Sequence, residues 1–205
     1  MDKTPARYEF RIWGNHLSPI RDQLAKEAPA GAPRESSETY ILSRATDTAN
    51  VKFRGGLLDI KLFAEQAGRL ERWRPVLKAG FPLDSRTIVE NVFPNLAVAV
   101  PHIERPSYTY DELINELIKP EADLAIVEVT KSRTGFTFER YTAEFAVIGI
   151  VGGGTTETVE LESEDSAAVL RAIAKLGLNS QPNINYVRHL KLMIGMTPRS
   201  TASAS

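Results

Sequence analysis

The sequence predicts an α+β fold with about eight strands and several helices inserted between them. Three observations lead to this prediction: short segments alternate apolar and polar residues, turn residues separate these segments, and other segments have helical spacing behind a capping residue. Such a sheet either folds over as a sandwich or closes on itself. The chain has 205 residues, of which 42% are hydrophobic and 25% charged. We therefore expect one domain over residues 1–195 and a flexible tail over residues 196–205.

Strands are predicted where the alternation has a period of two. In residues 7–13, Glu9, Arg11 and Trp13 fall on one face and the apolar residues on the other. Gly55-Gly56 separates two such segments, 51–54 and 57–61, and this predicts a hairpin. The remaining predicted strands cover residues 38–44, 69–78, 96–103, 122–133, 135–150 and 155–163.

Helices are predicted behind capping residues. Ser18-Pro19 begins one that runs to residue 26, and Thr109 begins another that Pro120 ends. Three more are expected at residues 84–93, 163–176 and 185–194, the second of them ended by Gly177. Residues 28–37 are rich in Pro, Gly and Ser and are expected to be loose, like the tail.

Composition and charge exclude several classes of protein. The 25 Lys and Arg residues balance 26 Asp and Glu residues, which argues against duplex DNA or an anionic membrane as partner. The absence of cysteine removes disulfides, thiolate zinc sites and cysteine nucleophiles. No apolar run approaches the ~18 residues of a membrane span, and the first residues do not resemble a secretion signal. We expect a cytoplasmic protein, and a homodimer is left open.

Charged residues recur in pairs at a spacing of two, so each pair lies on one face of its strand. One interpretation is a solvated outer face. The other is that these faces converge on the concave side of a sheet that closes around a wet or ligand-filled interior. Basic side chains facing one another repel unless an anion lies between them, so the second interpretation predicts a polyanionic ligand inside the sheet. The pairs are Glu9/Arg11, Lys52/Arg54, Asp59/Lys61, Lys131/Arg133 and Glu160/Glu162.

The order of these motifs resembles the CYTH superfamily, also called triphosphate tunnel metalloenzymes. The opening strand with Glu9, the basic hairpin that ends at Lys61, the later basic strand and the closing strand with Glu160 and Glu162 stand in the family's order. The resemblance implies an antiparallel eight-stranded β-tunnel with peripheral helices, lined by basic residues and glutamates. It also implies metal-dependent chemistry on triphosphates, as in thiamine triphosphatases, class IV adenylyl cyclases and fungal-type RNA triphosphatases.

The opening motif departs from the family pattern E-x-E-x-K. Arg11 stands in place of the second glutamate, which is a metal ligand in the family, and Trp13 stands in place of the lysine. The metal ligands that the resemblance still implies are Glu9, Glu160 and Glu162, with Glu144 as a further candidate, for Mg²⁺ or Mn²⁺. Arg11 would add positive charge where that ion would lie.

Two functions are therefore weighed, and no catalytic residue is assigned. The preferred one is a tunnel that binds a phosphorylated organic anion, a nucleotide or cyclic nucleotide, in which Arg11 contacts a phosphate and Trp13 stacks on a base. The alternative is a metal-dependent triphosphate hydrolase. The third possibility is a scaffold or partner-binding domain whose tunnel no longer binds a ligand. The predicted ligand-binding residues are Arg11, Trp13, Lys52, Arg54, Lys61, Lys131 and Arg133.

Overall fold

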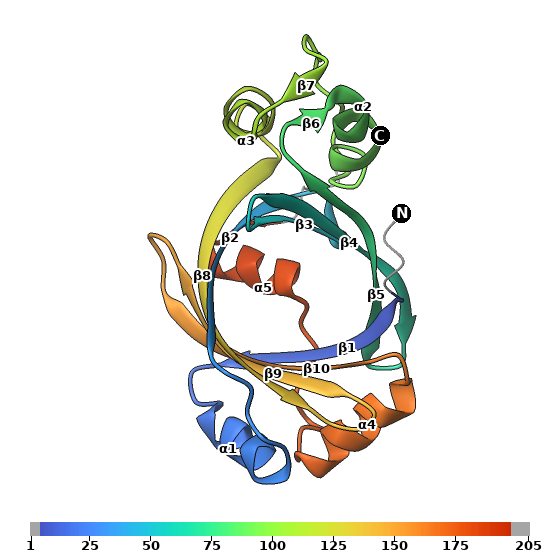
Figure 1. The fold of residues 1–205 in the computed structure, drawn as a ribbon, viewed down its shortest axis with the longest axis vertical. Helices are drawn as coiled ribbons and strands as arrows, with labels where there is room; N and C mark the ends of the chain where they lie inside the picture. Colours follow the sequence, from blue (N-terminus) through green and yellow to red (C-terminus); the bar gives the residue numbers. More distant parts are fainter. Residues whose placement is uncertain (1–4, 198–205) are drawn as a thin grey trace, which may run out of the picture.

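Eight antiparallel strands close into a barrel in the computed structural model, which describes residues 5–197. Figure 1 looks along the barrel and shows the strands as a ring. The predicted α+β fold and its eight-stranded antiparallel tunnel are confirmed. Around the ring the strands are β1 (Arg7–Gly14), β10 (Thr155–Ser163), β9 (Thr142–Ile150), β8 (Leu124–Thr137), β2 (Arg34–Ser43), β3 (Thr46–Arg54), β4 (Leu57–Ala67) and β5 (Leu70–Gly80).

The strand register decides which charges meet inside the barrel. On β1 and β10, Arg11 lies opposite Glu160 and Glu9 lies opposite Glu162. On β2 and β3, Glu38 lies opposite Arg54. The barrel closes where residues 7–9 of β1 pair with residues 71–73 of β5. Because side chains alternate along each strand, these charged residues share the inner face.

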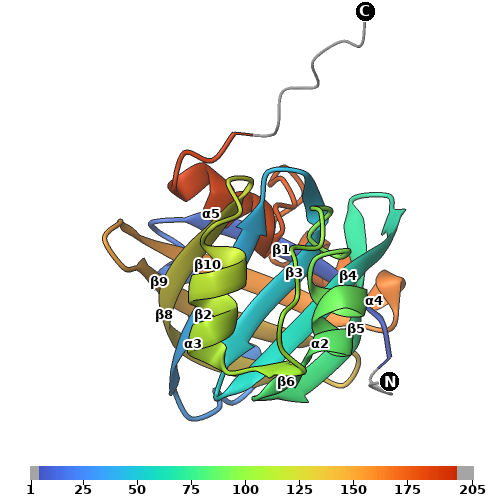
Figure 2. The same ribbon diagram turned by 90° about the horizontal axis from the view of Figure 1, so that it is seen from above.

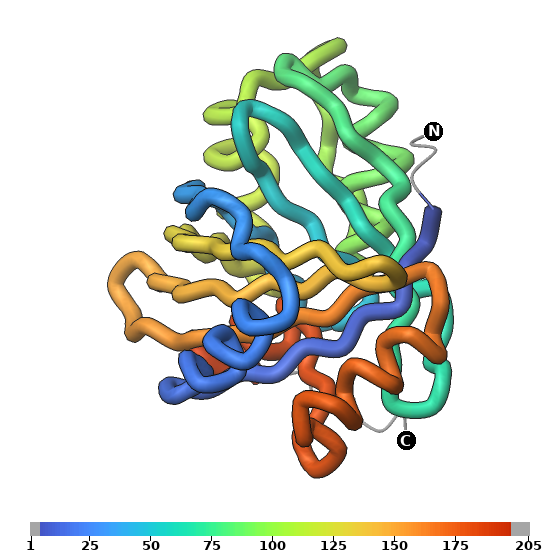
Figure 3. The backbone as a smooth tube through the Cα atoms, turned by 60° about the horizontal axis from the view of Figure 1, so that its bottom comes forward, coloured from blue at the N-terminus to red at the C-terminus, as the bar shows by residue number. Residues whose placement is uncertain are grey.

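Two groups of helices cover the outer face of the barrel. Helices α1 (Ser18–Glu27) and α4 (Ser166–Lys175) lie beside β1, β9 and β10, as Figure 3 shows. They bury outward apolar residues such as Phe10 and Leu161. On the opposite side, outward residues of β3 and β4 are buried under a second layer (Figure 1). That layer comprises β6 (Leu83–Asp84), α2 (Ser85–Thr87), the π-helical turn η1 (Ile88–Val92), β7 (Ser107–Tyr108), α3 (Tyr110–Glu112) and the π-helical turn η2 (Leu113–Ile118).

Helix α5 (Tyr186–Met193) closes one end of the barrel. It lies across the ring in Figure 1 and at one end of the strands in Figure 2. Its residues Tyr186, Val187 and Leu190 pack against inward apolar side chains, including Leu42 and Ile148. The interior is therefore apolar under α5 and charged further along the barrel.

Some predicted boundaries are wrong. Residues 96–103 form no strand within the described chain; Leu96 is buried beneath η1 and Ala97 has a positive φ of 55°. Of the segment 28–37, expected to be loose, residues 34–37 belong to β2 because they pair with β8. The predicted break at residues 134–135 does not exist, since β8 continues to Thr137.

The predicted tail lies mostly outside the described residues, but Met196, its first residue, is buried against α5. Within residues 5–197, no helix combines the length and the apolar character that a membrane crossing needs.

Candidate functional site

A cavity of about 160 Å³ lies inside the barrel. Six basic and four acidic side chains line it, and they come from six different strands. The charged faces thus point into the barrel, as one of the two predicted interpretations required, and not into bulk solvent. The charged lining residues are Arg11, Lys52, Arg54, Lys61, Lys131, Arg133, Glu9, Asp59, Glu144 and Glu160.

One side of the cavity is basic, and we call Lys52, Arg54, Lys131 and Arg133 the basic cluster. At its centre is Glu38, whose side chain is fully buried. One carboxylate oxygen of Glu38 lies 3.2 Å from Lys52 Nζ and 2.8 Å from Lys131 Nζ, and the other lies 3.6 Å from Arg54. Arg54 also contacts Asp59 at 3.3 Å. Three of the four cations therefore share two carboxylates, and the fourth, Arg133, has only a 3.8 Å approach to Glu144.

This excess of positive charge perturbs the ionisation of the cluster. Burial, together with the neighbouring ammonium of Lys52, lowers the pKa of Lys131 to about 7. Burial also lowers the pKa of Lys52, although Glu38 opposes the shift. Burial alone would raise the pKa of Glu38, but the two ammonium groups outweigh it and hold that pKa well below its usual range. An anion placed here would offset the cost of keeping both lysines charged.

The other side of the cavity is acidic, and we call Glu9, Glu144, Glu160 and Glu162 the acidic cluster. Arg11 contacts Glu160 at 2.6 Å, and Lys61 contacts Glu9 at 2.9 Å and Glu162 at 4.0 Å. Burial raises the pKa of Glu9 to about 7, with Lys61 opposing the shift. Burial would also raise the pKa of Glu160, but Arg11 and Lys61 reverse the effect and set it at about 2. Glu160 is thus the ionised member that holds Arg11.

Three polar atoms of the cavity lining are buried without a hydrogen-bond partner among the described residues. They are Asn50 Oδ1, Arg133 Nε and the hydroxyl oxygen of Tyr186. A buried polar group without a partner costs about 1–3 kcal/mol. Native proteins keep such groups mostly where a ligand, an ion or water can satisfy them. These atoms therefore mark the cavity as a place where a polar ligand would gain contacts.

Aromatic residues form the floor of the cavity beneath α5. Tyr186 stacks on Tyr40 with ring centroids 4.9 Å apart. Lys131 Nζ and the Arg11 guanidinium lie 4.0 Å and 5.1 Å from the Tyr186 ring centroid. Lys131 also donates a hydrogen bond to the Tyr40 hydroxyl at 2.7 Å. Sequence reasoning placed Tyr186 only in the core of a helix, because nothing in its spacing revealed that the helix closes a barrel.

Trp13 is not among the residues that line the cavity. Its indole stacks on His189 at 3.8 Å, meets the edge of Tyr186 at 5.0 Å, and donates a hydrogen bond to the Ile184 carbonyl. Of the seven predicted ligand-binding residues, Trp13 alone does not line the cavity, although the Arg11 guanidinium lies 5.6 Å from its ring centroid. These contacts are packing contacts, and one face of the ring is covered by His189.

The acidic cluster does not offer the ligands that the metal implied by the resemblance requires. Mg²⁺ and Mn²⁺ require oxygen ligands, above all carboxylates. Here Arg11 and Lys61 already neutralise Glu160 and Glu9. Within residues 5–197 no three His, Cys, Asp or Glu side chains are grouped so that they could hold a metal ion. Glu9, Glu160 and Glu162 as arranged do not fit a divalent cation, and we assign it no step.

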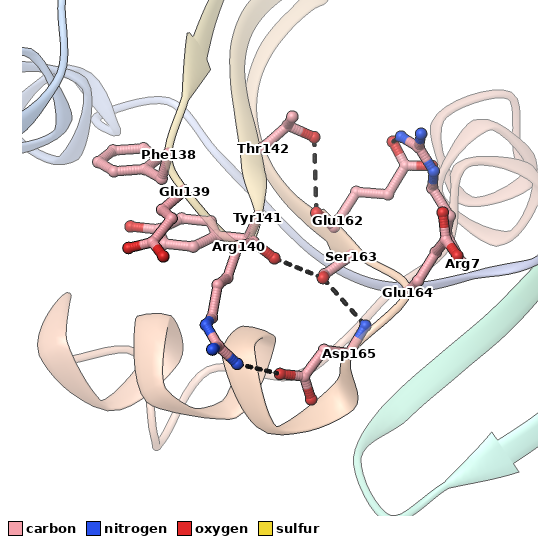
Figure 4. Close-up of a pocket in the computed structure, with 10 residues that line it drawn as sticks. All are labelled: Arg7, Phe138, Glu139, Arg140, Tyr141, Thr142, Glu162, Ser163, Glu164 and Asp165. Atoms are coloured by element: carbon pink, nitrogen blue, oxygen red, sulfur yellow. Dashed lines mark hydrogen bonds and ion pairs between the residues drawn. The ribbon is translucent and has the colours of Figure 1, made fainter.

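The cavity opens at the end of the barrel opposite α5. A pocket of about 220 Å³ at that mouth shares Glu144 and Glu160 with the cavity and is also lined by Arg34. A further pocket of about 370 Å³ lies outside the barrel, next to the turn between β8 and β9 (Figure 4). Some of its polar groups already have partners: Arg140 contacts Asp165, and Ser163 donates to the Arg140 carbonyl. The barrel interior is therefore the candidate site.

The fold and the site define a closed antiparallel barrel with a charged interior that is closed at one end. No family model matches the sequence, and no curated protein matches it.

Among solved structures, the chain is similar to the PH1012 protein of Pyrococcus horikoshii OT3, with 13% identity, a TM-score of 0.49, and 87% of this chain and 97% of that chain covered. It is similar to a "putative adenylate cyclase" of Bacillus halodurans, with 14% identity, a TM-score of 0.47, and 91% and 98% covered. A third likeness is to the S. pombe RNA triphosphatase Pct1, with 7% identity, a TM-score of 0.35, and 93% and 82% covered. These identities and TM-scores are too low to assign a family or a function.

Proposed function

We propose that the barrel interior binds the phosphate part of a phosphorylated organic anion. The single observation behind this proposal is the imbalance of the basic cluster, in which Lys52, Arg54 and Lys131 share Glu38 and Asp59, while Arg133 only approaches Glu144. Phosphate oxygens accept several charge-assisted hydrogen bonds at once, which suits converging lysine and arginine side chains. The Arg133 side chain has the most hydrogen-bond donors left for a ligand, since it makes no hydrogen bond to any described residue and its closest carboxylate is 3.8 Å away.

The size of the cavity limits which part of the ligand can lie inside it. Pockets that enclose a whole drug-sized molecule usually measure about 300–1,000 Å³, and this one measures about 160 Å³. The phosphate groups would therefore lie inside, with the organic remainder at the mouth. A nucleotide fits this division, but Trp13 is not placed to stack on its base, so this proposal gives Trp13 no role.

Triphosphate hydrolysis remains the alternative, and the same experiments separate it from binding alone. Release of orthophosphate from tripolyphosphate or ATP, with and without Mg²⁺ or Mn²⁺, measures turnover directly. Turnover that is lost on chelation would favour the hydrolase.

The test is Arg133→Gln, with binding of tripolyphosphate and ATP measured by isothermal titration calorimetry in the presence and absence of Mg²⁺. A hydrogen bond to a charged group contributes about 1.5–3 kcal/mol, so affinity should fall about 10- to 150-fold. Arg86→Gln is the matched control, because Arg86 is 83% exposed and pairs only with Glu90. Wild-type protein that binds neither compound, or equal affinities of wild type and Arg133→Gln, would refute the proposal.

A further inference from the structure

Another pocket, of about 320 Å³, lies on the outer face of the barrel, beside the hairpin turn that joins β3 and β4. Three aromatic rings, Phe53, Phe81 and Tyr110, contribute to its wall. Their centroids are 5.1–5.7 Å apart, and Tyr110 meets the other two edge-on. Such edge-to-face pairs form a fixed apolar surface on which a planar group can lie.

The polar atoms around this pocket are few. Ser37 is exposed on β2, and the Tyr110 hydroxyl donates to Thr39 at 3.2 Å. Gly55 and Gly56 form the turn at the rim with φ values of 56° and 74°, and an added Cβ at either would meet nothing within 4 Å. The rim between the pocket and the barrel mouth is therefore free of side chains at the turn.

Arg54 connects this pocket to the interior cavity, because it lines both. Its guanidinium reaches inward to Glu38 and Asp59, yet 35% of its side chain is exposed. A ligand whose phosphates lie beside Arg54 would thus have an aromatic surface within reach across the Gly55-Gly56 turn.

We propose that this aromatic pocket is a subsite for a planar, aromatic part of the ligand whose phosphates the barrel binds. The inference rests on the proposed function of the interior. The pocket complements the cavity in size and chemistry: the cavity is small and charged, and the pocket is larger and mostly apolar. A phosphate compound that bears an aromatic ring should therefore bind more tightly than a phosphate chain of the same charge.

The experiment compares ATP with inorganic tripolyphosphate on two variants. Ser37→Tyr fills the pocket from an exposed strand position, and Tyr110→Leu removes one ring of its wall. Loss of a stacking contact should weaken ATP binding about 5- to 150-fold while tripolyphosphate binding stays as in the wild type. Thr130→Tyr is the matched control, because Thr130 is exposed on β8 directly opposite Ser37 and does not line the pocket.

The outcomes distinguish the two proposals. If the wild type binds neither compound, the proposed function fails and this inference fails with it. If both compounds bind and Ser37→Tyr leaves the ratio of their affinities unchanged, only the subsite is refuted. An equal loss of affinity for both compounds in Ser37→Tyr would also refute it, since the substitution would then disturb the barrel as a whole. A selective loss of ATP affinity supports it.

Discussion

Replacement of Glu38 by glutamine removes the one carboxylate that three cations of the basic cluster share. The side chain keeps its shape and can still accept a hydrogen bond from Tyr40, which now lies 2.7 Å away. Breaking a buried ion pair by removing one partner costs about 3–5 kcal/mol. For a domain of this size about 1 kcal/mol corresponds to roughly 2–4 °C, so the melting temperature should fall by about 6–20 °C.

The loss should depend on pH, because Lys131 can give up its proton. Its pKa is already about 7, and removal of the Glu38 charge lowers it further. At pH 8 the neutral lysine relieves part of the repulsion, so the drop should be smaller at pH 8 than at pH 6. Tripolyphosphate should restore part of the lost stability, by about 2.7 kcal/mol at 100 times its dissociation constant.

Thermal unfolding followed by circular dichroism at pH 6 and pH 8, with and without tripolyphosphate, measures all three effects. Glu90→Gln is the control, since Glu90 forms an exposed pair with Arg86 that should contribute only about 0.3–0.5 kcal/mol. If Glu38→Gln has the same melting temperature as the wild type at pH 6, Glu38 does not hold the basic cluster together and the electrostatic argument is wrong.

Two further predictions concern Lys131 and Trp13. Between pH 7 and about 10.5 the unfolded chain binds more protons at Lys131 than the folded chain does, so the free energy of unfolding should rise with pH across that window. Lys131→Met should flatten this rise in urea titrations at several pH values, and an unchanged slope would contradict the assigned pKa. Trp13→Ala should cost about 3 kcal/mol in urea unfolding, because the indole packs on His189 and Tyr186. The affinity for tripolyphosphate should not change in Trp13→Ala. A large loss of that affinity would show that Trp13 contributes to the binding site.

The sequence predicted that the charged residues of each pair share one face of their strand, but it left open whether that face points into a barrel or into solvent. Alternation along a strand places Lys52 beside Arg54, and Lys131 beside Arg133, on one face. The structure shows that this face lines the cavity and that Phe53 points outward into the layer over β3 and β4. The Gly55-Gly56 hairpin was predictable for the same local reason. Local patterns of this kind do not depend on which strands become neighbours.

The role of Glu38 could not be predicted, because it depends on strand pairing. Glu38 faces Lys52, Lys131 and Arg54 only once β2 lies between β3 and β8. The sequence argument assumed that the basic residues would repel one another without a ligand, and it therefore missed the internal carboxylate. The only available signal was that Glu38 and Tyr40 share a face with a spacing of two.

Two other errors have the same origin. Residues 96–103 form a short apolar run, which periodicity cannot distinguish from a buried strand, and they lie instead as irregular chain beneath η1. Residues 34–37 have a loop-like composition but gain hydrogen bonds along β8, so pairing with a distant strand outweighs local preference.

Helix α5 makes the barrel a blind channel. A ligand that reaches the basic cluster would enter and leave at the end of the barrel opposite α5, where Arg34 lines the mouth. A long polymer could thus insert a terminus but could not thread through, so reaction or recognition would be confined to chain ends. Exchange of one ligand for another would also be sequential, since a second ligand can bind only after the first has dissociated.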